Sequence, residues 1–196
     1  DENVAIGESA LRENTASDNV AVGSNALRYN TVGNTNTAIG YKALFTNVAG
    51  DRSVAVGYQT LVNQTVASTA DMYNVMVGYN AGYAITSGTK NVGVGGLVLD
   101  SVTTGDGNVG VGYNSGTNIT TGDNNIAIGN GSLDATTTAS NNTAVGTSTL
   151  GSNTTGTQNT AIGFNSQALT STADQNTSVG SHSLDANTTG DDNTAI

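Results

Sequence analysis

The sequence contains no cysteine, proline or tryptophan, one histidine, and only 10% charged residues. Absence of cysteine excludes disulfides and thiol chemistry. The longest apolar runs are a handful of residues, far below the roughly 20 that span a bilayer, and no signal peptide is recognisable. All five lysines and arginines precede residue 91, and the net charge is -10. We therefore expect neither nucleic acid nor an anionic membrane as a partner.

Glycine, asparagine and threonine are abundant instead, with 26, 26 and 31 copies, over two-fifths of the chain. Globular domains are usually about 45–50% apolar and about 25% charged, whereas this chain is 36% hydrophobic. These values argue against an ordinary single-core enzyme domain. The low charge and the many β-formers also argue against disorder.

A glycine recurs at a nearly fixed period, closing each copy of an N-[VT]-A-[IV]-G motif. The steps between successive glycines are 16, 17, 17 and 21, and then 17 six times. The series is Gly7, Gly23, Gly40, Gly57, Gly78, Gly95, Gly112, Gly129, Gly146, Gly163 and Gly180. So strict a period indicates one structural unit stacked many times.

Each position of the repeat has its own preference. Asn stands four residues before the glycine in all copies but the one with Ser53, and Ile or Val stands directly before the glycine. A small residue, mostly Ala, lies between them; Leu usually follows the glycine by four positions and Thr by eight. The short V-A-I segment predicts a strand, the glycine predicts a turn, and the N-T-T-G stretch predicts a second extended segment.

The repeat predicts an all-β fold, a parallel β-solenoid of about eleven 17-residue coils that covers residues 1–196 as a single array. At about 4.8 Å per coil the array would be about 50 Å long. The four extra residues between Gly57 and Gly78 fall around residues 67–73 and predict an outward bulge. The Asn column predicts a ladder of hydrogen bonds from coil to coil and to the turn backbone.

Alternation along the strand predicts which residues face inward. We expect the Ile/Val column and the Leu column to fill the coil, and the Ala column to face outward, where small side chains allow another chain to approach closely. Met76 is the one large residue in that column. A core of about three apolar side chains per coil is thin against the entropy of ordering 17 residues, which favours an oligomer.

The motif resembles two families of fibrous repeats. N-[ST]-V-A-I-G resembles the head repeats of trimeric autotransporter adhesins, although those run near 14 residues. Copies such as Asn36 to Leu44 and Asn142 to Gly156 are more similar to shaft repeats of tail-fibre and surface proteins of phages and bacteria. The resemblance covers essentially the whole chain. It implies a left-handed β-roll packed as a homotrimer, a piece of a longer fibre without caps, on a virion tail or bacterial cell surface.

The resemblance suggests a structural fibre shaft that projects a receptor-binding tip for host attachment. Two alternatives remain open: a surface adhesin head that itself binds matrix or glycan, and an ice-binding solenoid. The last would use threonines, but the N-T-T stretch predicts a single outward column rather than a flat two-column face.

Few residues suggest chemistry. His182 lies in a column that reads as a solvated turn, and the recurrent Asp eleven residues after the glycine is typical of turns, although stacked carboxylates are also a calcium-binding pattern. We predict no enzyme, no metal and no cofactor. The candidate ligand-binding residues are exposed aromatics one residue after the glycine, which suit sugars or a subunit seam. They are Tyr41, Tyr58, Tyr79 and Tyr113.

Overall fold

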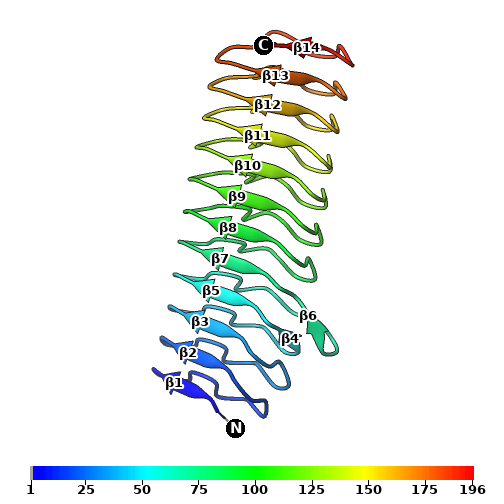
Figure 1. The fold of residues 1–196 in the computed structure, drawn as a ribbon. Coiled ribbons are helices and arrows are strands. Elements are labelled where there is room, and N and C mark those ends of the chain that lie inside the picture. The colour runs from blue at the N-terminus through cyan, green and yellow to red at the C-terminus, as the bar shows by residue number, and fades with distance from the viewer. Residues whose placement is uncertain (1) are drawn as a thin grey trace.

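The chain forms a rod of stacked coils (Figure 1). The computed structural model describes residues 2–196, and within that range it contains strands and turns but no helix. One 12-stranded parallel sheet runs the length of the rod, with one short strand from each coil. Its strands are β1 (Val4–Ile6), β2 (Val20–Val22), β3 (Thr37–Ile39), β5 (Val54–Val56), β7 (Val75–Val77), β8 (Val92–Val94), β9 (Val109–Val111), β10 (Ile126–Ile128), β11 (Thr143–Val145), β12 (Thr160–Ile162), β13 (Thr177–Val179) and β14 (Thr194–Ala195). The predicted parallel β-solenoid is confirmed.

Each residue of the sheet pairs with its equivalent in the next copy of the repeat. Ala21 pairs with Ala38, and Ala38 pairs with Ala55. The register survives the longest step, because Ala55 pairs with Met76 across the four extra residues. The 17-residue period is therefore the pitch of the solenoid.

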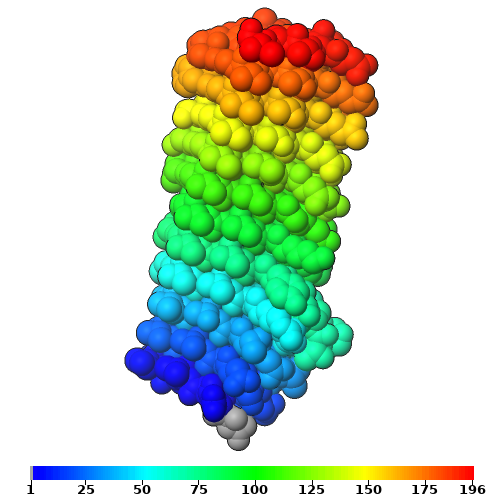
Figure 2. All heavy atoms as spheres, in the orientation of Figure 1, coloured from blue at the N-terminus to red at the C-terminus, as the bar shows by residue number. Residues whose placement is uncertain are grey.

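The inserted residues form a lateral irregularity of the rod. Strands β4 (Gly50–Asp51) and β6 (Ala70–Asp71) pair in a separate two-stranded sheet, and the chain around β6 projects sideways, as predicted (Figures 1 and 2). The second extended segment predicted for every coil forms a strand only there. In other coils single backbone hydrogen bonds join this segment to its neighbour, such as the 2.8 Å bond from the Thr103 amide to the Thr120 carbonyl.

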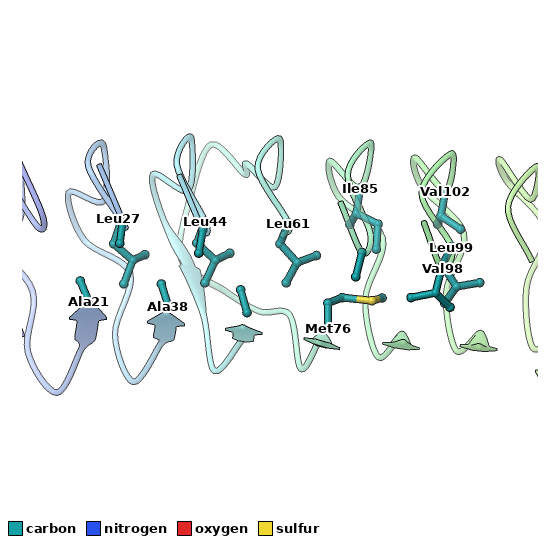
Figure 3. Close-up of a cluster of buried hydrophobic side chains, with 14 of the residues drawn as sticks. Ala21, Leu27, Ala38, Leu44, Leu61, Met76, Ile85, Val98, Leu99 and Val102 are labelled. Carbon is teal, nitrogen blue, oxygen red and sulfur yellow. The ribbon is translucent and has the colours of Figure 1, made fainter. Parts of the chain in front are cut away.

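The two faces of the strands are the reverse of the prediction. The small column lies inside, and Ala21, Ala38 and Ala55 have no exposed surface. Figure 3 shows Ala21 and Ala38 pointing up from the strands toward Leu27 and Leu44 of the opposite turn. The Ile/Val column lies outside, as Ile39 at 39% and Val94 at 45% exposure illustrate.

The narrow interior of a 17-residue coil explains this reversal. The leucine, for example Leu44, already fills the space above the strand, so only a methyl group fits beneath it. One coil demonstrates this: Met76 occupies the small position where Gly82 replaces the leucine. A Cβ on Gly82 would lie 3.0 Å from Cγ of Met76, so the methionine fills the volume that the missing leucine leaves.

The glycine after each strand is required by the stacking of the coils. Gly112 has φ +131°, a conformation that L side chains rarely adopt, and an added Cβ would lie 2.9 Å from the backbone of Gly129. The leucine four residues later also has positive φ, 50° at Leu44. A left-handed leucine costs about 1–2 kcal/mol, which burial of its side chain offsets.

The predicted asparagine ladder is confirmed, and it is buried. Asn108 Oδ1 accepts the backbone amide of Asn125 at 3.0 Å, and Asn125 Oδ1 accepts that of Asn142 at 3.1 Å. The side-chain nitrogen of Asn108, Nδ2, donates to the backbone carbonyl of Gly122 across the coil at 2.8 Å. Each asparagine thus ties its own coil together and fixes the coil that follows.

Candidate functional site

Three of the four predicted ligand-binding tyrosines form one stacked ladder. Each follows the glycine at the end of a strand, so the coil spacing superimposes them along the rod. The ring centroids of Tyr41 and Tyr58 are 5.3 Å apart with an angle of 22° between the planes, and those of Tyr58 and Tyr79 are 5.4 Å apart at 9°. Because the rings stack on one another, Tyr58 has an aromatic neighbour on each side.

The amino-terminal end of the ladder carries cations. Lys42 Nζ lies 5.4 Å from the ring centroid of Tyr41 and 5.0 Å from that of Phe45. Phe45 packs edge-on against Tyr29 at 4.9 Å, and the Arg28 guanidinium lies 5.2 Å from the Tyr29 ring. Cation–π contacts of this kind on an exposed surface contribute about 0.5–1 kcal/mol each.

The fourth predicted tyrosine stands apart from the ladder. Gly96 occupies the ladder position between Tyr79 and Tyr113, and within residues 2–196 no ring contact joins those two tyrosines. Tyr79 and Tyr113 are also the most exposed members of the set, at 56% and 54%. The stack therefore ends at Tyr79. Tyr113 is separated from it by one coil, in which the ladder position is a glycine and carries no ring.

His182 lies in an exposed turn. Its Nδ1 is 3.1 Å from Oδ2 of Asp185, and its ring packs edge-on against Phe164 at 5.4 Å. Nothing nucleophilic is among these contacts. The arrangement is that of a surface residue bonded to its own turn.

The recurrent aspartates bond to the neighbouring coil. Asp123 Oδ1 accepts the backbone amide of Asp106 at 2.8 Å, and Asp191 Oδ1 accepts that of Asp174 at the same distance. Across residues 2–196 no group of three or more His, Asp or Glu side chains is placed to hold a metal ion. These carboxylates cap turns of the solenoid.

Two other aspartates have perturbed acidities. Burial raises the pKa of Asp100, partly opposed by a hydrogen bond from the Ser101 hydroxyl, and burial likewise raises the pKa of Asp134. Both follow the glycine by five positions, in the column that holds Phe45, Val62 and Tyr83 in earlier coils. Neither has a histidine or second carboxylate bonded to it, so burial is the cause of both shifts.

Threonine hydroxyls of the N-T-T stretch are largely used within the rod. Thr103 Oγ1 donates to the carbonyl of Thr120, and Thr120 Oγ1 to that of Thr137. The following position is an exposed threonine in six successive coils. These residues are Thr104, Thr121, Thr138, Thr155, Thr172 and Thr189. The preceding threonine is half-buried at Thr103 and Thr120 but exposed at Thr137, Thr154 and Thr188, so the single outward column that the sequence predicted holds only in part of the rod.

One continuous surface feature was not predicted. The outward side of the 12-stranded sheet carries two aliphatic or threonine columns, one directly before the glycine and one two residues earlier. We call it the sheet face. Hydrophobicity alone predicts that its residues lie inside. The sequence signal for the opposite facing is one coil in which Met76 stands at the small position and Gly82 stands at the leucine position.

The described chain, residues 2–196, has no pocket and no helix that is both long and apolar enough to cross a membrane. In comparisons with known proteins, no family model, curated protein or solved structure matches the chain.

Proposed function

We propose that the chain is a shaft segment of an extracellular fibre, in which three copies pack through their sheet faces and hold a receptor-binding tip away from a virion or cell. The observation that carries the proposal is the continuous apolar surface of the sheet face. Its exposed members occur from β1 to β13, and include Val4, Ile6, Ile39, Val94, Val111, Ile126, Ile128, Ile162 and Val179.

Such a surface favours association. Monomeric proteins rarely expose contiguous apolar patches larger than a few hundred Å². The two columns of the sheet face, by contrast, continue along a rod that is about 50 Å long. The surface is flat and repeats with the coil spacing, so a second copy presents the same spacing along its length. The small column cannot provide this contact, because it is buried.

The interior supports a mechanical role. Backbone hydrogen bonds run along the rod at every coil, and the asparagine ladder adds buried bonds in the same direction. A solenoid held this way resists bending over its whole length. The net charge of -10 is consistent with a surface that avoids nucleic acid. The number of chains, three, follows from the resemblance of the repeat to trimeric fibre proteins.

Sedimentation equilibrium tests this proposal. We expect a mass three times the 19.5 kDa of one chain. Replacing Val94 and Val111 by aspartate would place charges on the sheet face and should dissociate the assembly, with β-structure retained. Thr104→Asp with Thr121→Asp is the matched control, because these residues lie in an exposed column away from the strands. A wild-type mass of 19.5 kDa would contradict the proposal.

A second function, an adhesin that binds matrix or glycan directly, is favoured by the exposed tyrosines. Aromatic side chains offer large contact surfaces at low cost in conformational entropy. Replacing Tyr41, Tyr58 and Tyr79 together by serine should then abolish binding of the intact protein to its host surface, while the chain stays folded and its melting temperature falls only by what the lost ring and Lys42 contacts explain. Retained binding by this variant would contradict the adhesin function and leave the shaft as the only proposed function.

A further inference from the structure

Two cations of the amino-terminal coils contact aromatic rings and no carboxylate. Within residues 2–196 neither Arg28 nor Lys42 forms an ion pair. Both belong to a series of ring contacts that we call the cation–aromatic surface, which consists of Arg28, Tyr29, Lys42, Phe45, Tyr41 and Tyr58. We propose that this surface binds a sugar that carries a carboxylate, as the acidic end of a glycan chain. The inference rests on the adhesin function proposed above and names the class of its ligand.

The contacts of the surface run without a break from Arg28 to the tyrosine ladder. The Arg28 guanidinium lies 5.2 Å from the Tyr29 ring, which packs edge-on against Phe45 at 4.9 Å. Lys42 Nζ lies 5.0 Å from the Phe45 ring and 5.4 Å from that of Tyr41, where the ladder begins. Two positive charges are therefore held beside three rings on two adjacent coils.

Both cations keep a charge that an anion can neutralise. An aromatic ring attracts a cation through its quadrupole but has no net charge of its own. Arg28 also keeps unused donors, because Nη1 donates to Asn25 Oδ1 at 2.9 Å while Nε is buried without a hydrogen-bond partner in residues 2–196. A guanidinium has five N–H donors in a planar fork that matches a carboxylate. A carboxylate is therefore the group that these two side chains lack.

The acidic residues of the chain leave room for such a ligand. Glu13 is paired with Arg12 at 3.4 Å. Glu8 precedes Tyr41 by two coils in the same column, about 10 Å, and the aspartates of the carboxyl-terminal half begin at residue 100, three coils or about 14 Å beyond Phe45. Both distances exceed the Debye length of about 8 Å at physiological ionic strength, so this repulsion is screened.

The exposed rings favour a sugar as the rest of the ligand. Tyr29, Tyr41 and Tyr58 are 40%, 39% and 45% exposed, and within residues 2–196 none of their hydroxyls has a hydrogen-bond partner. Ring surface suits the C–H groups of a sugar, and the phenol suits its hydroxyls. Because Tyr41 and Tyr58 stack on each other at 5.3 Å, no base inserts between them, which disfavours a single-stranded nucleic acid. Such a sugar lies on the open surface and requires no cleft.

The experiment compares sugars that differ only in charge. The probes are trigalacturonate, sialyllactose and the methyl esters of both, in which the carboxylates are neutral. Each is titrated into the full chain and followed by saturation-transfer NMR. We expect at least one acidic sugar to bind about tenfold more tightly than its ester, and added salt to weaken that binding.

Charge-removing variants locate the binding site. Arg28→Gln with Lys42→Gln removes both charges, keeps most of each aliphatic stem and should weaken binding of the acidic sugar about tenfold. Lys90→Gln is the matched control, because Lys90 is an exposed cation outside the cation–aromatic surface and should change the affinity less than about twofold. Circular dichroism and the melting temperature show that each variant is folded.

Four results would overturn the acidic-sugar site. They are failure of both acidic sugars to bind, equal binding of the esters, undiminished binding by the double glutamine variant, and binding of a thymidine hexanucleotide as tight as that of the best sugar. If neither acidic sugar binds while the triple tyrosine-to-serine variant still loses host binding, the adhesin function stands and the ligand class is wrong. The shaft function fails on a different result, a monomeric wild type, so the proposals can be separated.

Discussion

The amino-terminal coils (residues 19–64) and the central coils (residues 74–119) share one backbone but fill it differently. Three of the inward positions of each coil are the strand centre, the position four after the glycine, and the position seven after it. In the amino-terminal coils they hold Ala21, Leu27 and Asn30; Ala38, Leu44 and Asn47; and Ala55, Leu61 and Gln64. In the central coils they hold Met76, Gly82 and Ile85; Gly93, Leu99 and Val102; and Gly110, Gly116 and Ile119.

The difference shows that residues at the inward positions change together. Where the strand centre is the large Met76, the turn holds Gly82 in place of leucine, so the methionine occupies the volume that the leucine fills in other coils. The third position also changes in chemistry. Asn47 donates to Asn30 Oδ1 at 3.0 Å and accepts from Gln64 Nε2 at 3.2 Å, whereas Ile119 needs no partner.

The largest effect is expected from emptying a central coil. Met76→Ala removes the side chain that fills the space above Gly82, and no leucine is present to limit the cavity. We expect a loss of about 3–5 kcal/mol of unfolding free energy, measured by urea denaturation. The double variant Met76→Ala with Gly82→Leu recreates the amino-terminal pattern and should recover at least half of the loss. A double variant no more stable than Met76→Ala would contradict volume compensation.

An apolar substitution in the amino-terminal coils should cost somewhat less. Asn47→Leu leaves Asn30 Oδ1 buried without a partner and removes one of the two acceptors of Gln64 Nε2, which keeps Ser53 Oγ, for a loss of about 2–4 kcal/mol. The control is Ile119→Leu, a swap of equal volume at the same position of a central coil, which should cost less than about 1.5 kcal/mol. Equal losses in the two variants would show that the polar ladder adds nothing beyond packing.

Crowding the glycine beside Met76 should have a moderate and conditional effect. A Cβ on Gly93 would overlap Sδ of Met76 and lie 3.0 Å from Cγ1 of Val98. We expect Gly93→Ala to cost about 1–3 kcal/mol in the wild-type chain. In the Met76→Ala background the same change should be neutral or stabilising, because the added methyl enters the new cavity. A cost that is the same in both backgrounds would exclude contact with Met76 as its cause.

The smallest effect concerns pH. Burial raises the pKa of Asp134, so the folded chain holds this proton more tightly than the unfolded chain, and stability is lost as pH rises through the raised pKa. Asp134→Asn should therefore melt a few degrees higher than the wild type near pH 7 and equally below about pH 3, where both side chains are neutral. Exposed Asp192 gives the control variant, Asp192→Asn. A gain that persists at low pH would point to a different cause.

The period alone predicted much of the fold. Stacking in register, the place of the bulge near residue 70 and the asparagine ladder all follow from letters that recur every 17 residues. The facing of the strand did not, because Ile and Val are more hydrophobic than Ala, while the narrow interior admits only the methyl group. That constraint is readable only from the joint change at Met76 and Gly82.

The candidate site was predicted in part. The tyrosine column and its interruption at Gly96 are visible in the sequence, but the stacking of Tyr58 between two rings depends on coil spacing and side-chain direction, which the letters do not carry. The partners of the recurrent aspartates were equally hidden, since each lies a full coil away, as with Asp123 and the amide of Asp106.

The central claim is that equivalent residues form straight columns, one coil apart, along the rod. The chain has no cysteine, so a pair of cysteines introduced at chosen sites can be labelled specifically with nitroxides. Diluting the labelled protein with unlabelled protein isolates the distances within one chain. With labels at positions 104 and 189, which are five coils apart, pulsed electron paramagnetic resonance should give a mean distance of about 24 Å. Moving the second label from position 189 to position 172 should shorten this distance by about 5 Å. A distance that does not shorten when fewer coils separate the two labels would contradict the stacked columns.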